Sequence, residues 1–118
     1  MDDEISWTLE LAIEPEHLAA FRDLAKAMVA NARTEPGTLT YEFAFTDDGR
    51  VAHIRERYAN DAAAQQHSAT YVEKFERRLL ALARPVRLCA YGRPAPKTRA
   101  NLDGPDSVFL TPFAGLRR

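Results

Sequence analysis

The chain has 118 residues, of which 46% are hydrophobic and 28% are charged, and its formal net charge is −1. This length suits one domain with a real hydrophobic core and is too short for two. The near-neutral charge excludes bulk attraction to nucleic acid or to an anionic membrane, and the single cysteine, Cys89, excludes an internal disulfide.

Acidic residues open the chain, and no apolar run approaches the roughly 20 residues of a membrane span. We therefore expect a cytoplasmic protein without a signal peptide.

The N-terminal residues predict a strand followed by a helix. Residues 5–12 are predicted to form a half-buried strand, because apolar and polar side chains alternate from Ile5 to Leu11. Pro15 suits the first turn of a helix, and apolar residues then recur at helical spacing as far as Ala32.

A hairpin comes next, with strands predicted at residues 38–46 and 50–58. The residues between them, Asp47-Asp48-Gly49, tolerate the positive φ angles of a tight turn. The alternation of the second strand assigns its side chains to two faces. One face carries Ala52, Ile54, Glu56 and Tyr58, and the opposite face carries Val51, His53, Arg55 and Arg57.

Two helical stretches and a fourth strand complete the pattern. Asn60 is a candidate N-cap for a short helix that ends near His67, and Thr70 with Glu73 resembles a capping box for a second helix over 71–83. Pro85 is expected to end that helix, before a strand at 86–92.

The element order β-α-β-β-α-β predicts an α+β fold, with a ferredoxin-like antiparallel sheet that has both helices on one face. We assign residues 1–92 to this domain and 93–118 to a C-terminal extension. The extension is polar and rich in proline over 93–106 and apolar over 107–113, which favours an arm that pairs with a strand edge, expected to be that of a partner. The second face of the sheet carries acids and bases on neighbouring strands, which favours pairing of two copies in a homodimer.

Three stretches resemble the antibiotic biosynthesis monooxygenase family: EPGTLTYEF at 35–43, ERYANDAAAQQH at 56–67 and YVEKF at 71–75. The resemblance covers about residues 5–92, and the tail motif VFLTPFAG is similar to an extension of some members. It implies a dimeric α+β barrel with two sheets back to back, and a pocket between each sheet and its helices. It also implies cofactor-independent oxygenation of quinols or polycyclic phenols. Tyr58 stands where the family usually has tryptophan, which departs from the haem-degrading pattern.

Such oxygenation needs a substrate that reduces O₂ itself once it is deprotonated, so we expect neither a cofactor nor a metal. The protein must supply an apolar pocket, a base, and donors for a developing oxyanion. The predicted catalytic residues are His67, Glu56 and Tyr58. Residues predicted to contact an aromatic substrate are Trp7, Tyr41, Phe43, Ile54, Phe21, Met28, Tyr71 and Phe75.

Each of these residues also has a structural interpretation. His67 could be a surface or hydrogen-bonded helix histidine, Glu56 could bind an arginine or a backbone N–H, and the aromatic residues could form core. The alternative functions are a non-catalytic small-molecule-binding dimer of the same fold and a haem-degrading monooxygenase. A nucleic-acid-binding module is disfavoured, because the strand at 50–58 has no Gly-aromatic-aromatic pattern for base stacking and the net charge is near neutral.

Overall fold

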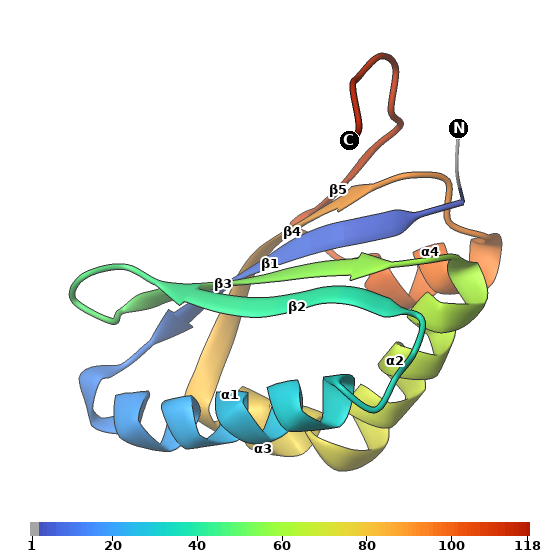
Figure 1. Cartoon of the computed structure of the whole chain (residues 1–118). Coiled ribbons are helices and arrows are strands. Elements are labelled where there is room, and N and C mark those ends of the chain that lie inside the picture. The colour runs from blue at the N-terminus through green and yellow to red at the C-terminus, as the bar shows by residue number, and fades with distance from the viewer. Residues whose placement is uncertain (1–2) are drawn as a thin grey trace.

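The computed structural model describes residues 3–118, and Figure 1 shows one sheet with its helices gathered on one face. The elements are β1 (Ile5–Ile13), the 3₁₀ turn η1 (Pro15–His17), α1 (Leu18–Ala32), β2 (Thr38–Phe45), β3 (Val51–Tyr58), α2 (Asp61–Lys74), α3 (Glu76–Leu82), β4 (Ala83–Tyr91), α4 (Pro96–Leu102) and β5 (Ser107–Leu110). The strand order is β2-β3-β1-β4-β5. The predicted ferredoxin-like α+β fold is confirmed for the first four strands, which pair antiparallel, and a fifth strand is added at one edge.

The two faces of β3 are those that the alternation predicts. Glu56 and Tyr58 point toward the helices and are buried, with 5% and 0% of their surfaces exposed, whereas Arg55 and Arg57 are exposed. Glu56 lies opposite Trp7 of β1 on one side and Tyr41 of β2 on the other. The register of three strands therefore places a carboxyl group among aromatic side chains.

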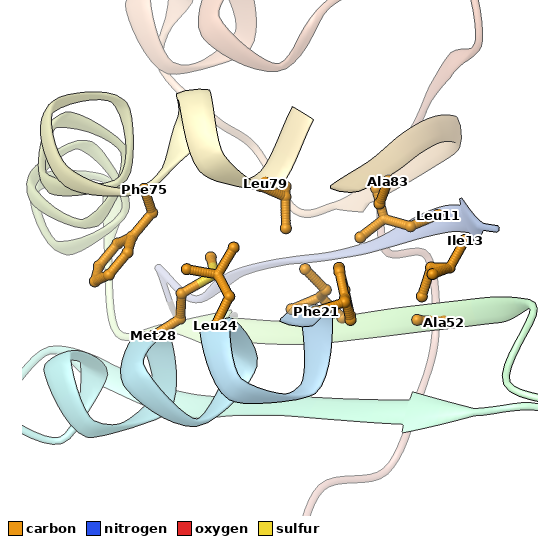
Figure 2. Packing of buried hydrophobic residues seen from close by; sticks show 10 residues of the cluster. Leu11, Ile13, Phe21, Leu24, Met28, Ala52, Phe75, Leu79 and Ala83 are labelled. Atoms are coloured by element: carbon orange, nitrogen blue, oxygen red, sulfur yellow. The ribbon is translucent and has the colours of Figure 1, made fainter. Parts of the chain in front are cut away.

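The core lies between the sheet and the helices α1 and α3. Phe21, Leu24 and Met28 form the buried stripe of α1, and they pack with Leu79 of α3 and Leu11 of β1 (Figure 2). Leu11 and Leu79 are fully buried. This cluster fixes one end of the sheet against the helices.

The helices after β3 differ from the predicted pair. Asn60 caps α2 as expected, since its side chain accepts a hydrogen bond from the N–H of Ala63 at 2.9 Å. The predicted capping box at Thr70 is wrong, because α2 runs through it and the break occurs at Phe75. The Phe75 ring is buried in the core, so tertiary packing places the break there, whereas the polar residues before it continue the helix.

The fourth strand begins at Ala83, three residues earlier than predicted, and Pro85 lies inside it. The β1–β4 register shifts between Glu10 and Leu11, and Leu11 faces Pro85 just after the shift. Proline is tolerated in a strand at such an irregularity, because no regular ladder hydrogen bond is required of it there.

The C-terminal extension contains more structure than a polar linker. Helix α4 forms within the segment predicted as linker, and β5 pairs with β4 of the same chain in parallel. Packing of this extension on a partner stays a prediction. Beyond β5, Phe113 and Leu116 leave 98% and 78% of their surfaces exposed.

The face of the sheet away from the helices is uncovered in the single chain (Figure 1). Polar side chains pair across its strands: the His53 imidazole lies 3.1 Å from Glu10, and the Arg55 guanidinium lies 2.7 Å from the Glu42 carboxylate. Within the described part of the chain, no helix combines the length and the apolar character that crossing a bilayer requires.

Candidate active site

A cavity of about 760 Å³ lies between the sheet and helices α2 and α4, and it reaches both His67 and Glu56. Its volume is within the range of small-molecule pockets. Five of the predicted site residues line it: Trp7, Tyr41, Glu56, His67 and Tyr71. The other lining residues are Leu9, Leu88, Gln65, Gln66, Ser68, Ala69, Val72, Glu73, Glu76, Lys97, Asn101 and Leu102.

Small residues let α2 approach the turn before β2 closely. A Cβ added to Gly37 would lie 2.5 Å from the Cβ of Ala63, so this contact requires glycine at one side and a small residue at the other. The carbonyl of Gly37 also accepts a hydrogen bond from the N–H of Ala59 at 2.9 Å. The Glu35-Pro36-Gly37 turn is thereby held against α2, the helix that carries His67.

His67 is buried, with 6% of its surface exposed, and Glu35 holds one side of its ring. Nδ1 of His67 lies 2.9 Å from Oε1 of Glu35, and that oxygen also accepts a hydrogen bond from Thr38 Oγ1 at 2.8 Å. Because a carboxylate accepts hydrogen bonds, Nδ1 donates its hydrogen to Glu35, and in the neutral form of the ring the lone pair is then on Nε2. Nε2 points toward Glu56, whose Oε1 is 3.5 Å away.

Two tyrosine rings fix the plane of the imidazole. The ring of Tyr41 lies 4.8 Å from the His67 ring between centroids, and the ring of Tyr58 lies 5.0 Å from it. Burial raises the pKa of both tyrosines above the ordinary value, and the nearby Glu56 raises them further. Both hydroxyls therefore stay protonated, and the Tyr58 hydroxyl donates a hydrogen bond to Glu56.

Glu56 is a carboxylic acid with a strongly perturbed titration. Burial raises its pKa from 4.5 to about 8, although hydrogen bonds from Tyr58 and Trp7 favour the ionised form, and the negative charge of Glu35 adds to the rise. The Tyr58 hydroxyl donates to Oε1 of Glu56 at 2.6 Å. The raised pKa keeps the carboxyl of Glu56 protonated at neutral pH, and this carboxyl faces Nε2 of His67, so the site can pair an acid with a base.

The remaining predicted residues lie outside this cavity. Phe21, Met28, Ile54 and Phe75 belong to the buried core cluster. Phe43 packs against that cluster and lines a separate groove between α1 and β2. Tyr58 lies behind Glu56, to which it donates its hydrogen bond. For these residues, direct contact with a substrate stays a prediction.

Local sequence patterns did not identify Glu35 or the residues of α4 as members of the candidate site. Glu35 stands in a Pro-Gly turn, which is typical of a loop, and its contact with His67 spans 32 positions of the chain. Lys97, Asn101 and Leu102 stood in the segment expected to be a linker, and the pattern of that segment gave no sign that it returns to the cavity. Among residues 3–118, no group of three or more His, Cys, Asp or Glu side chains is arranged to hold a metal ion.

Comparisons with known proteins identify a family for this chain. A family model described as antibiotic biosynthesis monooxygenase matches residues 5–72, which is more than half of the chain. A search of curated proteins gave no significant match.

Solved structures match the fold over most or all of the chain. MupZ from Pseudomonas fluorescens is 25% identical, with a TM-score of 0.89, and the match covers 100% of this chain and 91% of MupZ. PA3566 from Pseudomonas aeruginosa is 27% identical, with a TM-score of 0.68, over 80% of this chain and 98% of its own. A putative antibiotic biosynthesis monooxygenase from Bacteroides thetaiotaomicron is 25% identical, with a TM-score of 0.67, over 73% and 85% of the two chains.

Proposed function

The chain belongs to the antibiotic biosynthesis monooxygenase family, and we propose that it is a cofactor-independent monooxygenase that oxidises an aromatic quinol or phenol. The observation that carries this proposal is one cavity that reaches both His67 and Glu56. The wall near them is aromatic, formed by Trp7, Tyr41 and Tyr71. A flat, electron-rich substrate would be held there with its hydroxyl near the acid–base pair.

His67 is the base of this reaction. Glu35 binds its Nδ1–H, so the lone pair of Nε2 is available to take the proton of a substrate hydroxyl. The resulting anion has a lower oxidation potential than the neutral phenol and can transfer an electron to O₂. Glu35 stabilises the imidazolium that forms, in the way a carboxylate does beside other catalytic histidines.

Glu56 is the proton donor. Because its pKa is raised to about 8, it holds a proton at neutral pH, and it can give that proton to the oxygen atom that leaves. For a substrate of the anthrone type, a CH₂ group becomes a carbonyl. The substrate gives four electrons, one atom of O₂ enters the product and the other leaves as water, so the reaction balances without an external reductant.

Oxygen uptake with 1,8-dihydroxyanthrone and with naphthoquinols tests this proposal. We expect uptake above the buffer rate and one atom of ¹⁸O from ¹⁸O₂ in the product. His67→Ala should lower the rate by about 10²–10⁴-fold. His17→Ala, which changes a histidine that does not line the cavity, is the matched control and should leave the rate unchanged. No uptake above buffer, or equal rates for the two variants, would count against the proposal.

A second candidate function is a non-catalytic binding protein that uses the same cavity. It is favoured by the mutual satisfaction of the site's polar groups, since in the described chain no buried side-chain nitrogen or oxygen lacks a hydrogen-bond partner. Such a protein would gain thermal stability from a quinol in the absence of O₂ and would release that quinol unchanged. Recovery of an oxygenated product after aerobic incubation would eliminate this candidate.

We also propose that the protein is a homodimer built on the uncovered face of the sheet. The support is the apolar surface at the β5 side, where Val108, Leu110 and Phe113 are exposed by 44%, 42% and 98%. Large exposed apolar side chains grouped in this way are typical of protein interfaces. Light scattering should give twice the chain mass of 13.3 kDa, and Phe113→Asp should shift the mass toward that of one chain.

A further inference from the structure

The C-terminal extension forms one wall of the cavity, through residues beyond the region that the family model matches. We propose that this wall selects an amphipathic substrate with an apolar body and one carboxylate, and that Lys97 binds the carboxylate. The inference rests on the proposed function for the position of the reacting group beside His67. It adds the chemical class of the part of the substrate that does not react.

Helix α4 is held in a fixed position by Asp61, in the first turn of α2. One oxygen of Asp61 accepts the N–H of Ala95 at 2.8 Å, and the other accepts Thr98 Oγ1 at 3.0 Å and Gln65 Nε2 at 2.7 Å. Thr98 is 1% exposed, so the bond to its hydroxyl is shielded from water. The backbone of α4, from which side chains extend to the cavity, is therefore positioned by the fold.

Those side chains are Lys97, Asn101 and Leu102. Lys97 and Asn101 are one helical turn apart and lie on the same side of α4. Leu102 packs with the buried cluster around Trp7, at the inner end of this wall. The other cation of α4, Arg99, lies over the ring of Phe109 at 4.0 Å. Lys97 is thus the cation that α4 offers to the cavity.

The charges around the cavity are separated along α2. Asp61 joins α4 to the first turn of α2, whereas Glu73 and Glu76, which also line the cavity, belong to the last turn of α2 and the start of α3. From Gln65 to Glu73 the helix rises about 12 Å, at 1.5 Å per residue. This separation is close to the Debye length of about 10 Å at 0.1 M salt, so the charges at the two ends of α2 are partly screened from each other. In residues 3–118, no carboxylate forms a salt bridge with Lys97.

These features define a ligand with two parts. The apolar lining from Trp7, Leu9 and Leu102 accepts the body, and a carboxylate extends toward α4, where Lys97 supplies the charge and Asn101 supplies an amide N–H. A neutral molecule of the same shape would lose only the charge interaction. The preference for acid over amide therefore measures the contribution of Lys97.

A matched pair of probes tests the inference: naphthalene-2-acetate and naphthalene-2-acetamide. Neither has a phenolic hydroxyl, so binding is measured without turnover, by quenching of the fluorescence of Trp7, the single tryptophan, which lines the cavity. We expect the acid to bind about three- to five-fold more tightly than the amide at low salt. Lys97→Ala should abolish this preference, and Lys97→Glu should reverse it. Lys74→Ala removes an equal charge outside the cavity lining and should leave the preference intact.

Three results would overturn the inference: equal binding of acid and amide to the unmodified protein, no binding of either probe, or an unchanged preference in Lys97→Glu. A protein that shows the preference but consumes no O₂ with any quinol would refute the proposed oxygenation alone. A protein that oxidises quinols but shows no preference would refute the role of Lys97 alone.

Discussion

Replacement of Glu56 by glutamine tests the electrostatics of the candidate site, because glutamine keeps the shape of the side chain and removes its titration. The Tyr58 hydroxyl donates to Oε1 of Glu56 at 2.6 Å, and the amide oxygen of glutamine can accept the same bond. The Glu56→Gln variant therefore separates the charge of this group from its geometry.

The size of the effect follows from the pKa of Glu56, which burial raises from 4.5 to about 8. Between these two pH values the folded protein keeps the proton and the unfolded chain has lost it, so unfolding releases a proton. The free energy of unfolding of the wild type should then fall by about 1.4 kcal/mol per pH unit as the pH rises. Over the whole interval the loss from this group is on the order of 5 kcal/mol, and above pH 8 it no longer grows.

Urea unfolding at intervals from pH 5 to pH 9 measures this dependence. Trp7 is the single tryptophan and is 5% exposed, so its fluorescence reports unfolding, and far-UV circular dichroism gives a second probe that does not depend on contacts with Glu56. Relative to the wild type, Glu56→Gln should gain stability steadily up to pH 8. Glu16→Gln, which removes an exposed carboxylate from η1, serves as the control and should follow the wild type.

A stability difference between Glu56→Gln and wild type that stays constant within about 1 kcal/mol from pH 5 to pH 9 would refute the reasoning. Glu56 would then be ionised in the folded protein at neutral pH. It could not donate a proton to the leaving oxygen, and the assignment of acid and base in the site would fail.

Three further substitutions test how the site is held. Glu35→Gln should lower kcat by about 10–100-fold with a smaller change in KM, because the amide oxygen binds the Nδ1–H of His67 more weakly than a carboxylate does. A change confined to KM would show that Glu35 does not position the base. Gly37→Ala should lower the free energy of unfolding in urea by about 1–3 kcal/mol and lower kcat as well. The new methyl group meets the Cβ of Ala63 at 2.5 Å and moves the turn away from α2. A free energy of unfolding equal to that of the wild type would contradict this close approach. Asn60→Ala should cost about 1 kcal/mol of stability through loss of the α2 cap, with the Asn60→Asp variant as a control that retains the cap.

Local patterns in the sequence determined the order of the first four strands and the faces of the strands. The two-residue period of a strand is a property of each segment alone, so the alternation in β3 was enough to place Glu56 and Tyr58 under the helices and Arg55 on the open face. The capping preference of Asn60 acts within three residues, and the structure confirms it. The hairpin turn at Asp47-Asp48-Gly49 was visible for the same reason.

Tertiary structure decided what depends on contacts between distant segments. The helix break lies at Phe75, and not at the polar residues before it, because the Phe75 ring packs in the core. Helix α4 is fixed by Asp61, which is 34 positions from the backbone N–H that it binds. Glu35 becomes a partner of His67 only when the turn before β2 meets α2.

The cavity itself is the clearest case. Its walls come from β1, β2, β3, β4, α2, α3 and α4, and no local pattern encodes the distances between them. The sequence by itself provided a carboxylic acid and a histidine with suitable chemistry, and the strand period gave the direction of the carboxylic acid. Whether they face one opening depended on how α2 packs across the sheet, and small residues such as Gly37 and Ala63 set that packing through close contact.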